Sequence, residues 1–555
     1  MCGIFSFISD QPISDNLHSK LVQQALKSKH RGPDNTKYRL ETDKIFLAFH
    51  RLSINDISEN GDQPLIHPNN YNIILICNGE IYNHLKLKEQ FQFKTNSNSD
   101  CEIILHLYTK FGFKKAIEML DGVFACVLID LNDNKNIIYA ARDPIGVRSM
   151  YIGNQNDYKS YGFASELKNF QSIFDNIEQF KPGHIWDNIS NEYQCYYDKQ
   201  IIYNNPSFNY SIDEIKQNIR NLFSKAIEKR TMSDRNIGCL LSGGLDSSLV
   251  AALLTKFYTK KKKLKTFSIG LKGSPDLKYA KIVANHIGSN HHEIIVSEKQ
   301  LLDAIKDVIY QIESYDTTTI RASIPMFLLS KYIKDNTDIA VIYSGEGSDE
   351  ASGSYLYFHN APDNISFKNE TNRLMSDLCF FDVLRCDKST AAAGLEVRVP
   401  FLDKEFLKYY MNIDPCYKIP SFGNIEKFLL RKAFSEVESL LPDEIIWRTK
   451  EAMSDGISSQ ERGWYQIIQE YTDKIYSFYE FNILKNKYSI NPPMFKEALY
   501  YRETFNEFYP SRDYIIPYYW LPKWSGNINE PSARILTNIY NKNTEITNQS
   551  PTKFI

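Results

Sequence analysis

The sequence of 555 residues lacks several features that mark whole classes of protein. It has no apolar stretch of the eighteen or so residues that a membrane helix needs, and no signal segment near the N-terminus. It also lacks an excess of one charge, because 65 basic residues nearly balance 67 acidic ones and leave a formal net charge of -2. No overall field therefore recruits nucleic acid or an acidic membrane. We expect a cytoplasmic protein that binds small molecules, with no nucleic acid and no membrane among its partners.

Paired cysteines at metal or redox spacing are absent as well. The nine cysteines are scattered and include no Cys-x-x-Cys pair, which argues against a zinc site or a redox dithiol. Cys2 differs from the others because it directly follows Met1. Removal of Met1 would place a thiol and a free α-amine on one residue, and an amine of pKa about 7.7 to 8.0 can accept the thiol proton near neutral pH. Cys2 is thus a candidate nucleophile, although a buried thiol in a first strand is the alternative.

The N-terminal region reads as many strands with few helices. Helical apolar spacing covers residues 14–29, and Ser99 with Glu102 has the spacing of a capping box that starts a second helix. Apolar strand-like runs occur at residues 73–76, 123–130, 137–141, 149–152 and 161–164. This pattern predicts a layered sandwich of sheets and helices rather than a doubly wound parallel sheet.

The pattern changes after about residue 205. From residue 211 helical segments alternate with short apolar strands, which is the signature of a parallel sheet covered by helices. These strands are expected at residues 237–241, 266–269, 293–296 and 339–343. We therefore predict an α/β protein of two domains, with residues 2–205 in the first and 211–540 in the second. Residues 541–555 are polar, and we expect them to be a disordered tail.

The most specific motif is Ser242-Gly243-Gly244-Leu245-Asp246-Ser247-Ser248. It follows a predicted strand and opens a predicted helix, so its glycines allow backbone N–H groups to surround an anion at the positive end of that helix. The loop lacks the lysine of the G-x-x-x-x-G-K-[ST] motif, so it is not the usual γ-phosphate binder. We interpret it as a pyrophosphate cradle in which Asp246 helps to hold Mg²⁺. A serine-rich N-cap turn is the alternative.

A second loop, Ser344-Gly345-Glu346-Gly347-Ser348-Asp349-Glu350, also follows an apolar strand. In an open parallel sheet such loops meet at the carboxyl edge, where ligands bind. Asp349 is the second candidate ligand for Mg²⁺, and Glu346 is placed to orient or deprotonate an incoming amine. A plain acidic turn is the alternative.

A third group of residues lies in the N-terminal region around Asn78-Gly79-Glu80. The Asn78 side-chain amide and the Gly79 backbone N–H could point at one developing oxyanion. The guanidinium of Arg51 suits a carboxylate, and Asp100 could hold an ammonium group. Read singly, these residues are a turn, a surface charge and a cap. With Cys2, they describe a pocket for an α-amino acid that carries a side-chain amide.

Six segments together resemble the glutamine-hydrolysing asparagine synthetases. They are Met1 to Phe5, His30 to Asp34, Asn78 to His84, Ser242 to Ser248, Ser344 to Glu350 and Glu396 to Asp403. The resemblance extends from residue 1 to about residue 540. It implies an N-terminal α-β-β-α sandwich of the N-terminal nucleophile type, which is a class II glutamine amidotransferase domain. It also implies a C-terminal parallel α/β sheet of the ATP-pyrophosphatase type, with added helices.

The resemblance also implies roles for individual residues. Cys2 corresponds to the nucleophile, Asn78 and Gly79 to the oxyanion hole, and Arg51, Asn78, Glu80 and Asp100 to glutamine contacts. The matches to ATP-binding positions are Leu241, Ser242, Gly243, Gly244, Asp246, Ser247, Ile269, Ser344 and Gly345. Thr319 and Arg321 fall in the segment near the aspartate site, and Lys450 in the segment that meets the phosphates.

The implied reaction has two parts. Glutamine is hydrolysed to glutamate and ammonia, and ATP with Mg²⁺ adenylates the aspartate side chain, from which ammonia displaces AMP to give asparagine. A carboxylate needs this activation because it is a poor electrophile. Ammonia is mostly protonated at neutral pH, so we expect an apolar passage between the two sites. The sequence leaves the oligomeric state open, with a homodimer as one expectation.

The chain departs from the family at Ser354, Thr449 and Ala393, where the family commonly has Gly, Pro and an aromatic residue or His. If the backbone at Ser354 required φ > 0, the substitution would strain a loop near the active site.

Two other readings remain. An enzyme like β-lactam synthetase, which closes an amide within one substrate, would need no Cys2, Asn78 and Asp100. A catalytically silent scaffold would need neither the acidic residues of the two loops nor Lys450. Measuring pyrophosphate release with aspartate, ATP and Mg²⁺, with and without glutamine, separates the three.

Overall fold

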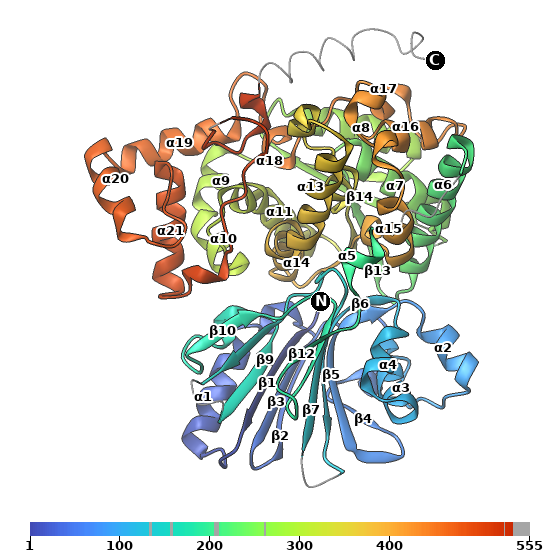
Figure 1. Ribbon diagram of the computed structural model, residues 1–555, viewed down its shortest axis with the longest axis vertical. Coiled ribbons are helices and arrows are strands. Elements are labelled where there is room, and N and C mark those ends of the chain that lie inside the picture. Colours follow the sequence, from blue (N-terminus) through green and yellow to red (C-terminus); the bar gives the residue numbers. More distant parts are fainter. Residues whose placement is uncertain (133–135, 156–158, 205–209, 260–261, 527, 537–555) are drawn as a thin grey trace.

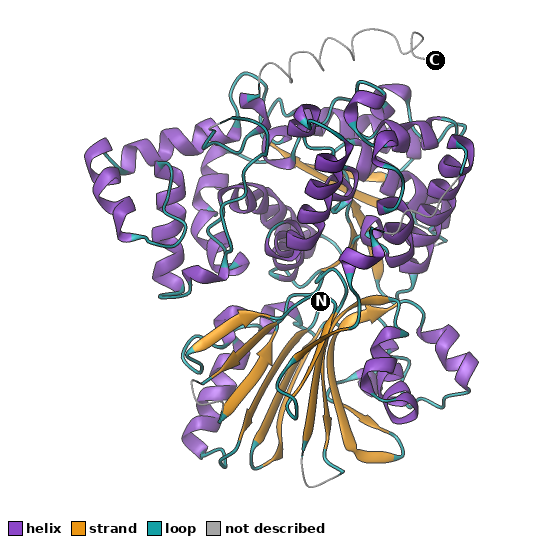
Figure 2. Ribbon diagram, in the orientation of Figure 1, coloured by secondary structure: helices purple, strands orange, loops and turns teal. Residues whose placement is uncertain are grey.

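The computed structural model describes residues 1–132, 136–155, 159–204, 210–259, 262–526 and 528–536. The predicted tail at residues 541–555 lies outside these ranges. Figure 1 shows two halves, a strand-rich one below and a helix-rich one above, and Figure 2 separates them by secondary structure. This arrangement confirms the predicted two-domain α/β fold class. No helix of the described segments is long and apolar enough to cross a membrane.

Two antiparallel sheets of six strands form the N-terminal half. The first has the order β10-β8-β9-β1-β3-β2, and its strands are β1 Gly3–Ser9, β2 Asn35–Thr42, β3 Ile45–Arg51, β8 Tyr151–Asn154, β9 Ser160–Ala164 and β10 Asn176–Gln179. The second has the order β12-β11-β7-β6-β5-β4, and its strands are β4 Leu65–His67, β5 Asn70–Ile81, β6 Gly122–Asp130, β7 Ile137–Arg142, β11 His184–Asp187 and β12 Tyr193–Cys195.

Helices cover the outer faces of the two sheets (Figure 1). They are α1 Asp15–Leu26 on the first sheet, and α2 His84–Phe91, α3 Ile103–Phe111 and α4 Phe113–Glu118 on the second. The alternation of side chains along β1 explains these layers. Ile4 and Ile8 belong to the core between the sheets, whereas Phe5 and Phe7 pack with Leu21 of α1. Because successive residues of a strand face opposite sides, an apolar strand can supply two cores.

The predicted capping box at Ser99 is wrong. The Ser99 side chain makes no capping hydrogen bond, and a short 3-10 turn, Asp100–Glu102, precedes α3. The Glu102 carboxylate instead accepts hydrogen bonds from the backbone N–H groups of Asn96 and Ser97, both at 2.8 Å. Because Glu102 binds the preceding loop, it is not available to form a capping box with Ser99. Asp100 lies in the 3-10 turn rather than in the helix.

The C-terminal half contains a parallel sheet of five strands in the order β15-β14-β13-β16-β17. The strands are β13 Asn236–Leu240, β14 Lys265–Gly270, β15 Asn290–Ile295, β16 Ile339–Tyr343 and β17 Glu396–Arg398. The first four match the prediction, and the short β17 was not predicted. After β13 the chain adds β14 and β15 on one side, and it then returns to add β16 and β17 on the other side. The loops after the parallel neighbours β13 and β16 therefore meet at the topological switch point, where ligands bind.

The helices of this half surround the sheet (Figure 2). They are α6 Ile212–Glu228, α7 Leu245–Phe257, α8 Pro275–Ile287, α9 Glu298–Asp303, α10 Ile305–Ile312, α11 Thr317–Asn336, α12 Ser348–Ser352, α13 Asn364–Asp377, α14 Asp382–Ala391, α15 Lys404–Met411, α16 Phe428–Ser435, α17 Asp443–Ile446, α18 Met453–Gly456, α19 Trp464–Ile475, α20 Phe478–Leu484 and α21 Lys496–Phe508. Helix α5 Lys199–Ile202 falls within the first predicted domain, residues 2–205.

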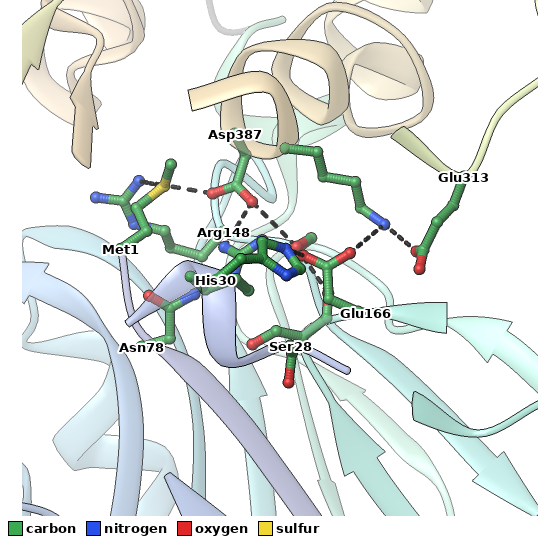
Figure 3. Close-up of polar contacts among 12 residues, drawn as sticks. Met1, Ser28, His30, Asn78, Arg148, Glu166, Glu313 and Asp387 are labelled. Atoms are coloured by element: carbon green, nitrogen blue, oxygen red, sulfur yellow. Dashed lines mark hydrogen bonds and ion pairs between the residues drawn. The ribbon is translucent and has the colours of Figure 1, made fainter. Parts of the chain in front are cut away.

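Buried charges of both signs join the two halves. We call this group the interface network; its members are Arg31, Glu166 and Lys168 from the N-terminal half and Glu313, Asp387 and Lys388 from the C-terminal half. Pairs that cross the interface include Arg31 Nη2 with Asp387 Oδ2 at 2.8 Å and Lys388 Nζ with Glu166 Oε2 at 3.2 Å. Figure 3 shows Glu166, Glu313 and Asp387 converging there. Each side chain is at most 1% exposed, so the charges have to compensate one another in the interior.

The interface network predicts a large cost for losing one cation. Lys388 contacts Glu313 and Glu166, so Lys388→Met leaves both carboxylates undercompensated in the interior and should lower the free energy of unfolding by about 3 to 5 kcal/mol. Urea unfolding measures this. The matched control is Lys299→Met, which breaks an ion pair with Asp303 whose side chains are 82% and 61% exposed and should change stability little. Equal stability of the two variants would contradict the role of the network.

Candidate functional site

A cleft opens at the carboxyl edge of the parallel sheet. Most of the residues predicted for nucleotide and phosphate chemistry line it, namely Leu241, Ser242, Gly244, Asp246, Ser247, Ile269, Ser344, Gly345, Glu346, Asp349 and Lys450. The structure thus brings together two loops that lie about a hundred residues apart in the sequence. Gly243 belongs to the same loop but does not line the cleft.

Glycines allow the two loops to approach each other. Gly243 has φ +73°, and a Cβ there would lie 2.4 Å from backbone atoms of Tyr279 and Ala280. A Cβ on Gly345 would lie 2.9 Å from the Ser247 backbone nitrogen. At the start of α7 the N-cap residue, Gly244, offers no side-chain cap, so the first N–H groups of that helix are available to an anion. This geometry suits a phosphate group.

Two carboxylates and two ammonium groups meet at the centre of the cleft. Lys427 Nζ lies 2.6 Å from Asp246 Oδ2 and 2.5 Å from Asp349 Oδ1, and Lys450 Nζ lies 2.5 Å from Asp349 Oδ2. Burial alone would raise the pKa of Asp349, but Lys427 and Lys450 outweigh it and hold that pKa below its usual range. Burial alone would lower the pKa of Lys450, but Asp349 and Asp246 raise it above its ordinary value. Asp349 and Lys450 are therefore both charged near neutral pH.

The Asp246–Asp349 pair fits a divalent cation. One small cation, Lys427 Nζ, already contacts an oxygen of each carboxylate, so both oxygens lie within reach of a single ion. Carboxylate oxygens are the hard ligands that Mg²⁺ prefers, and phosphates complete its coordination in many sites.

Glu346 lies in a different part of the cleft and is paired. Both its oxygens accept from Arg385, at 3.0 and 2.7 Å, and Arg385 also contacts Asp382 at 2.8 Å. Burial raises the pKa of Glu346 and Asp382 adds to the rise, while Arg385 opposes it. One side of the cleft therefore carries both acidic and basic side chains, next to the loops of residues 242–248 and 344–350. Such a surface suits a ligand with charges of both signs, such as an amino acid.

The structure does not bring Thr319 and Arg321 to the cleft lining. The Thr319 backbone N–H donates to the N-cap carboxylate of Asp316 at 2.8 Å, and the guanidinium of Arg321 is bound by Glu497 and Glu530. Neighbouring residues of the same helix, Thr318 and Ala322, line the cleft instead.

The strain considered at Ser354 is absent. Ser354 is not among the residues with positive φ, and Gly353 takes the left-handed conformation with φ +60°. The buried Ser354 hydroxyl donates to Asp349 Oδ1 at 2.6 Å. This departure from the family thus adds a donor to a carboxylate of the cleft.

A second cluster surrounds Cys2. The Cys2 backbone N–H donates to Asn78 Oδ1 at 3.0 Å, and its sulfur lies 3.5 Å from the Leu52 nitrogen. The Asn78 Nδ2 atom is buried and has no hydrogen-bond partner among the residues that the structure describes. Burial raises the pKa of the Cys2 thiol above its ordinary value. Close approach of Phe124 restricts residue 79 to glycine, because a Cβ there would lie 2.6 Å from the Phe124 Cβ.

Arg51, Glu80 and Asp100 line the same pocket as Cys2. Arg51 is already bound by Asp62 at 2.6 Å. Asn55 Nδ2 donates to Glu80 at 2.6 Å and lies 3.3 Å from Asp100. The structure therefore brings together all the residues predicted for this pocket.

The C-terminal half also reaches the Cys2 pocket. Glu396 lines it, and Arg398 Nη2 lies 3.2 Å from Glu80. Burial, together with the carboxylates of Glu396 and Asp100, raises the pKa of Glu80 well above its usual range, while Arg398 opposes the shift. Met1 is buried here too, with its sulfur 2.6 Å from Arg148 Nη1, and Figure 3 shows the two side by side.

Sequence reasoning assigned no role to several residues of the two sites. Lys427 lies in a segment without a motif, and only folding brings it to the carboxylates. The alternation of Glu396 and Arg398 with two valines is a strand signal that could have revealed a short strand with one polar face. Arg385 and Asp382 begin a helix and carry no comparable signal.

Comparisons with known proteins agree with this division. Residues 1–205 match the sequence profile of the glutamine amidotransferase domain, and residues 218–379 and 366–514 match that of asparagine synthase. The glutamine-hydrolysing asparagine synthetase of Gallus gallus is 44% identical over 97% of this chain and 98% of its own length. Those of Mus musculus and Homo sapiens are each 43% identical over 97% of this chain and 99% of their own length.

Lys427 offers a direct test of the cleft. Lys427→Met removes the cation shared by Asp246 and Asp349 and leaves the cleft more negative, so it should weaken binding of ATP by about tenfold or more. Calorimetric titration with ATP measures this. Lys408→Met, at an exposed lysine of α15, is the control and should bind ATP like the unmodified protein. Unchanged affinity of Lys427→Met would contradict the importance of this cation.

Proposed function

Because the chain belongs to the glutamine-hydrolysing asparagine synthetase family, we propose that the two pockets carry out the two parts of that family's reaction. The enzyme converts aspartate, glutamine, ATP and water into asparagine, glutamate, AMP and pyrophosphate. The observation that carries the assignment of the N-terminal pocket is the buried, unpartnered Asn78 Nδ2 beside Cys2. A buried amide donor without a partner is costly unless a ligand uses it.

In the first part, the Cys2 sulfur attacks the side-chain amide carbon of glutamine. Once Met1 is removed, the nitrogen of Cys2 is an amine that takes the thiol proton and returns it to the departing ammonia. Asn78 Nδ2 and the Gly79 N–H stabilise the oxyanion. Water then hydrolyses the thioester to give glutamate. Arg51 contacts the carboxylate of glutamine, and Glu80 and Asp100 contact its ammonium group.

In the second part, a side-chain oxygen of aspartate attacks the α-phosphorus of ATP, and pyrophosphate leaves. The loop from Ser242 to Ser247 and the Ser344-Gly345 backbone hold the nucleotide. Lys450, joined by Lys427, neutralises charge that develops on the phosphates. Ammonia then attacks the acyl carbon and AMP leaves, while Glu346 orients the amine and accepts its proton. Asp246 and Asp349 would hold Mg²⁺, which when bound draws charge from the phosphate oxygens.

Ammonia has to pass from one pocket to the other as the neutral molecule. One apolar cluster includes residues of both halves, among them Leu52, which lines the Cys2 pocket, and Val397, Val399 and Leu402, which lie in or after β17. Such surroundings disfavour ammonium and favour ammonia. They support the apolar passage expected from the sequence.

The proposal includes two further expectations. The lack of a membrane-crossing helix within the described ranges agrees with a cytoplasmic location, which fractionation of cells would test. Light scattering on the purified enzyme would test the homodimer.

Cys2→Ser separates the two parts of the reaction. Serine is a far weaker nucleophile than cysteine near neutral pH, so glutamate release and glutamine-dependent asparagine synthesis should fall about a thousandfold. Asparagine synthesis with ammonium chloride should stay within about twofold. Cys195→Ser, at an exposed thiol, is the control. The N-terminal mass of the active enzyme should show Cys2 as the first residue. Undiminished glutamate release by Cys2→Ser would refute the role of Cys2.

Removal of metal should affect only the second part. After treatment with EDTA, pyrophosphate release should fall to background and return when Mg²⁺ is added, while glutamate release continues. Asp349→Asn should raise the Mg²⁺ concentration for half-maximal rate by about tenfold or more, because one charged ligand is lost. Asp443→Asn, at an exposed carboxylate, is the control. A rate independent of Mg²⁺ would contradict the metal assignment.

A further inference from the structure

Helix α14 lines the nucleotide cleft and also contacts the N-terminal half. Arg385, near its start, lines the nucleotide cleft and pairs with Glu346. Asp387 follows two residues later and contacts the N-terminal half. Residues two apart on a helix point about 200° away from each other, so one rigid element faces the nucleotide cleft on one side and the N-terminal half on the other. Residues 383–391 are all buried, which leaves the helix little freedom to move alone.

A chain of contacts leads from Asp387 to the backbone of Cys2. Asp387 Oδ2 accepts from Arg31 Nη2 at 2.8 Å and from the Ser149 hydroxyl at 3.1 Å. Arg31 Nε in turn donates to the Cys2 carbonyl oxygen at 3.0 Å. Arg31 is fully buried, and its third nitrogen binds Glu166. Figure 3 shows Asp387 close to Glu166 and Arg148.

The hydrogen bond from Arg31 to the Cys2 carbonyl oxygen restrains the main chain of Cys2. If Cys2 is the first residue of the mature enzyme, no preceding peptide fixes it. Its main chain is then held by the contact of its nitrogen with Asn78 and of its carbonyl with Arg31. Rotation of the peptide that follows Cys2 would move both the amine and the sulfur. Misplacement of a reacting group by about 1 Å can cost about a hundredfold in rate.

We propose that Asp387, a residue of the synthetase half, is a positioning residue for glutamine hydrolysis, because it fixes Arg31 and thereby the Cys2 main chain. This inference rests on the proposed role of Cys2 as nucleophile. It makes the glutaminase site incomplete without the other half of the chain.

The rest of the interface network provides a matched control. Glu313 also crosses the interface, since its carboxylate accepts from the backbone N–H groups of Leu167 and Lys168 at 2.7 and 2.8 Å and pairs with Lys388. It has no contact with Arg31 or Cys2 among those described. Glu313→Gln therefore weakens the docking of the two halves without altering the support of Cys2.

The test compares Asp387→Asn with Glu313→Gln in the full-length enzyme. Asp387→Asn should lower kcat for glutamine hydrolysis by about tenfold or more, with KM for glutamine within about twofold, because attack is impaired and glutamine binding is not. It should slow alkylation of Cys2 by a glutamine analogue that carries an electrophilic diazoketone by a similar factor. Synthesis with ammonium chloride should stay within about twofold, which also shows that the variant is folded. Glu313→Gln should keep the kcat of the unmodified enzyme.

Arg31→Lys gives an independent reading, because lysine keeps the charge but cannot bind Asp387 and the Cys2 carbonyl with separate nitrogens. It should reproduce the loss in kcat. Equal losses in Asp387→Asn and Glu313→Gln, or normal hydrolysis by Asp387→Asn, would overturn the inference. If Cys2→Ser abolishes hydrolysis while Asp387→Asn is normal, only this inference fails. If Cys2→Ser still hydrolyses glutamine, the proposed function fails.

Discussion

The buried interface network is the constraint on which the rest of the structure depends. Three cations and three anions from both halves are buried and compensate one another. Such groups are stable only in one arrangement, because any rotation of one half would leave a charge unpaired in the interior. The network therefore sets the position of one pocket relative to the other. Apolar contacts alone would tolerate sliding, since they carry no comparable directional requirement.

The main features of the fold could be predicted from local patterns. Apolar runs located β5 to β9 and four strands of the parallel sheet, whereas the long strands β2 and β3 were not predicted. Glycine-rich turns directly after β13 and β16 located the cleft, because the strand–loop–helix sequence fixes where such loops lie. Predictions failed where the signal was short or ambiguous. Strand β17 has three residues, and Ser99 with Glu102 has the spacing of a cap although the Glu102 carboxylate binds the preceding loop.

Side chains that act across long separations could not be predicted in this way. Lys427 meets Asp246 and Asp349 only after folding, and no periodicity marks it. Arg321 shows another limit: the resemblance places its segment near the aspartate site, and Thr318 and Ala322 line the cleft, but two glutamates that are distant in the sequence bind the Arg321 guanidinium. The sequence alone could not decide whether the backbone at Ser354 has a positive φ. In the structure Gly353 takes the left-handed conformation instead, and the Ser354 hydroxyl binds the Asp349 carboxylate.

The centre of the nucleotide cleft is electrically balanced, with two carboxylates matched by two ammonium groups. A dication that arrived alone would disturb this balance, and so would an isolated polyphosphate. If both arrive together, the lysines can turn from the aspartates to the phosphates while the aspartates receive the metal, and the sum of charges changes least. Under the proposed function, this balance would favour binding of the nucleotide as its Mg²⁺ salt over binding of either ion alone, before any bond is broken.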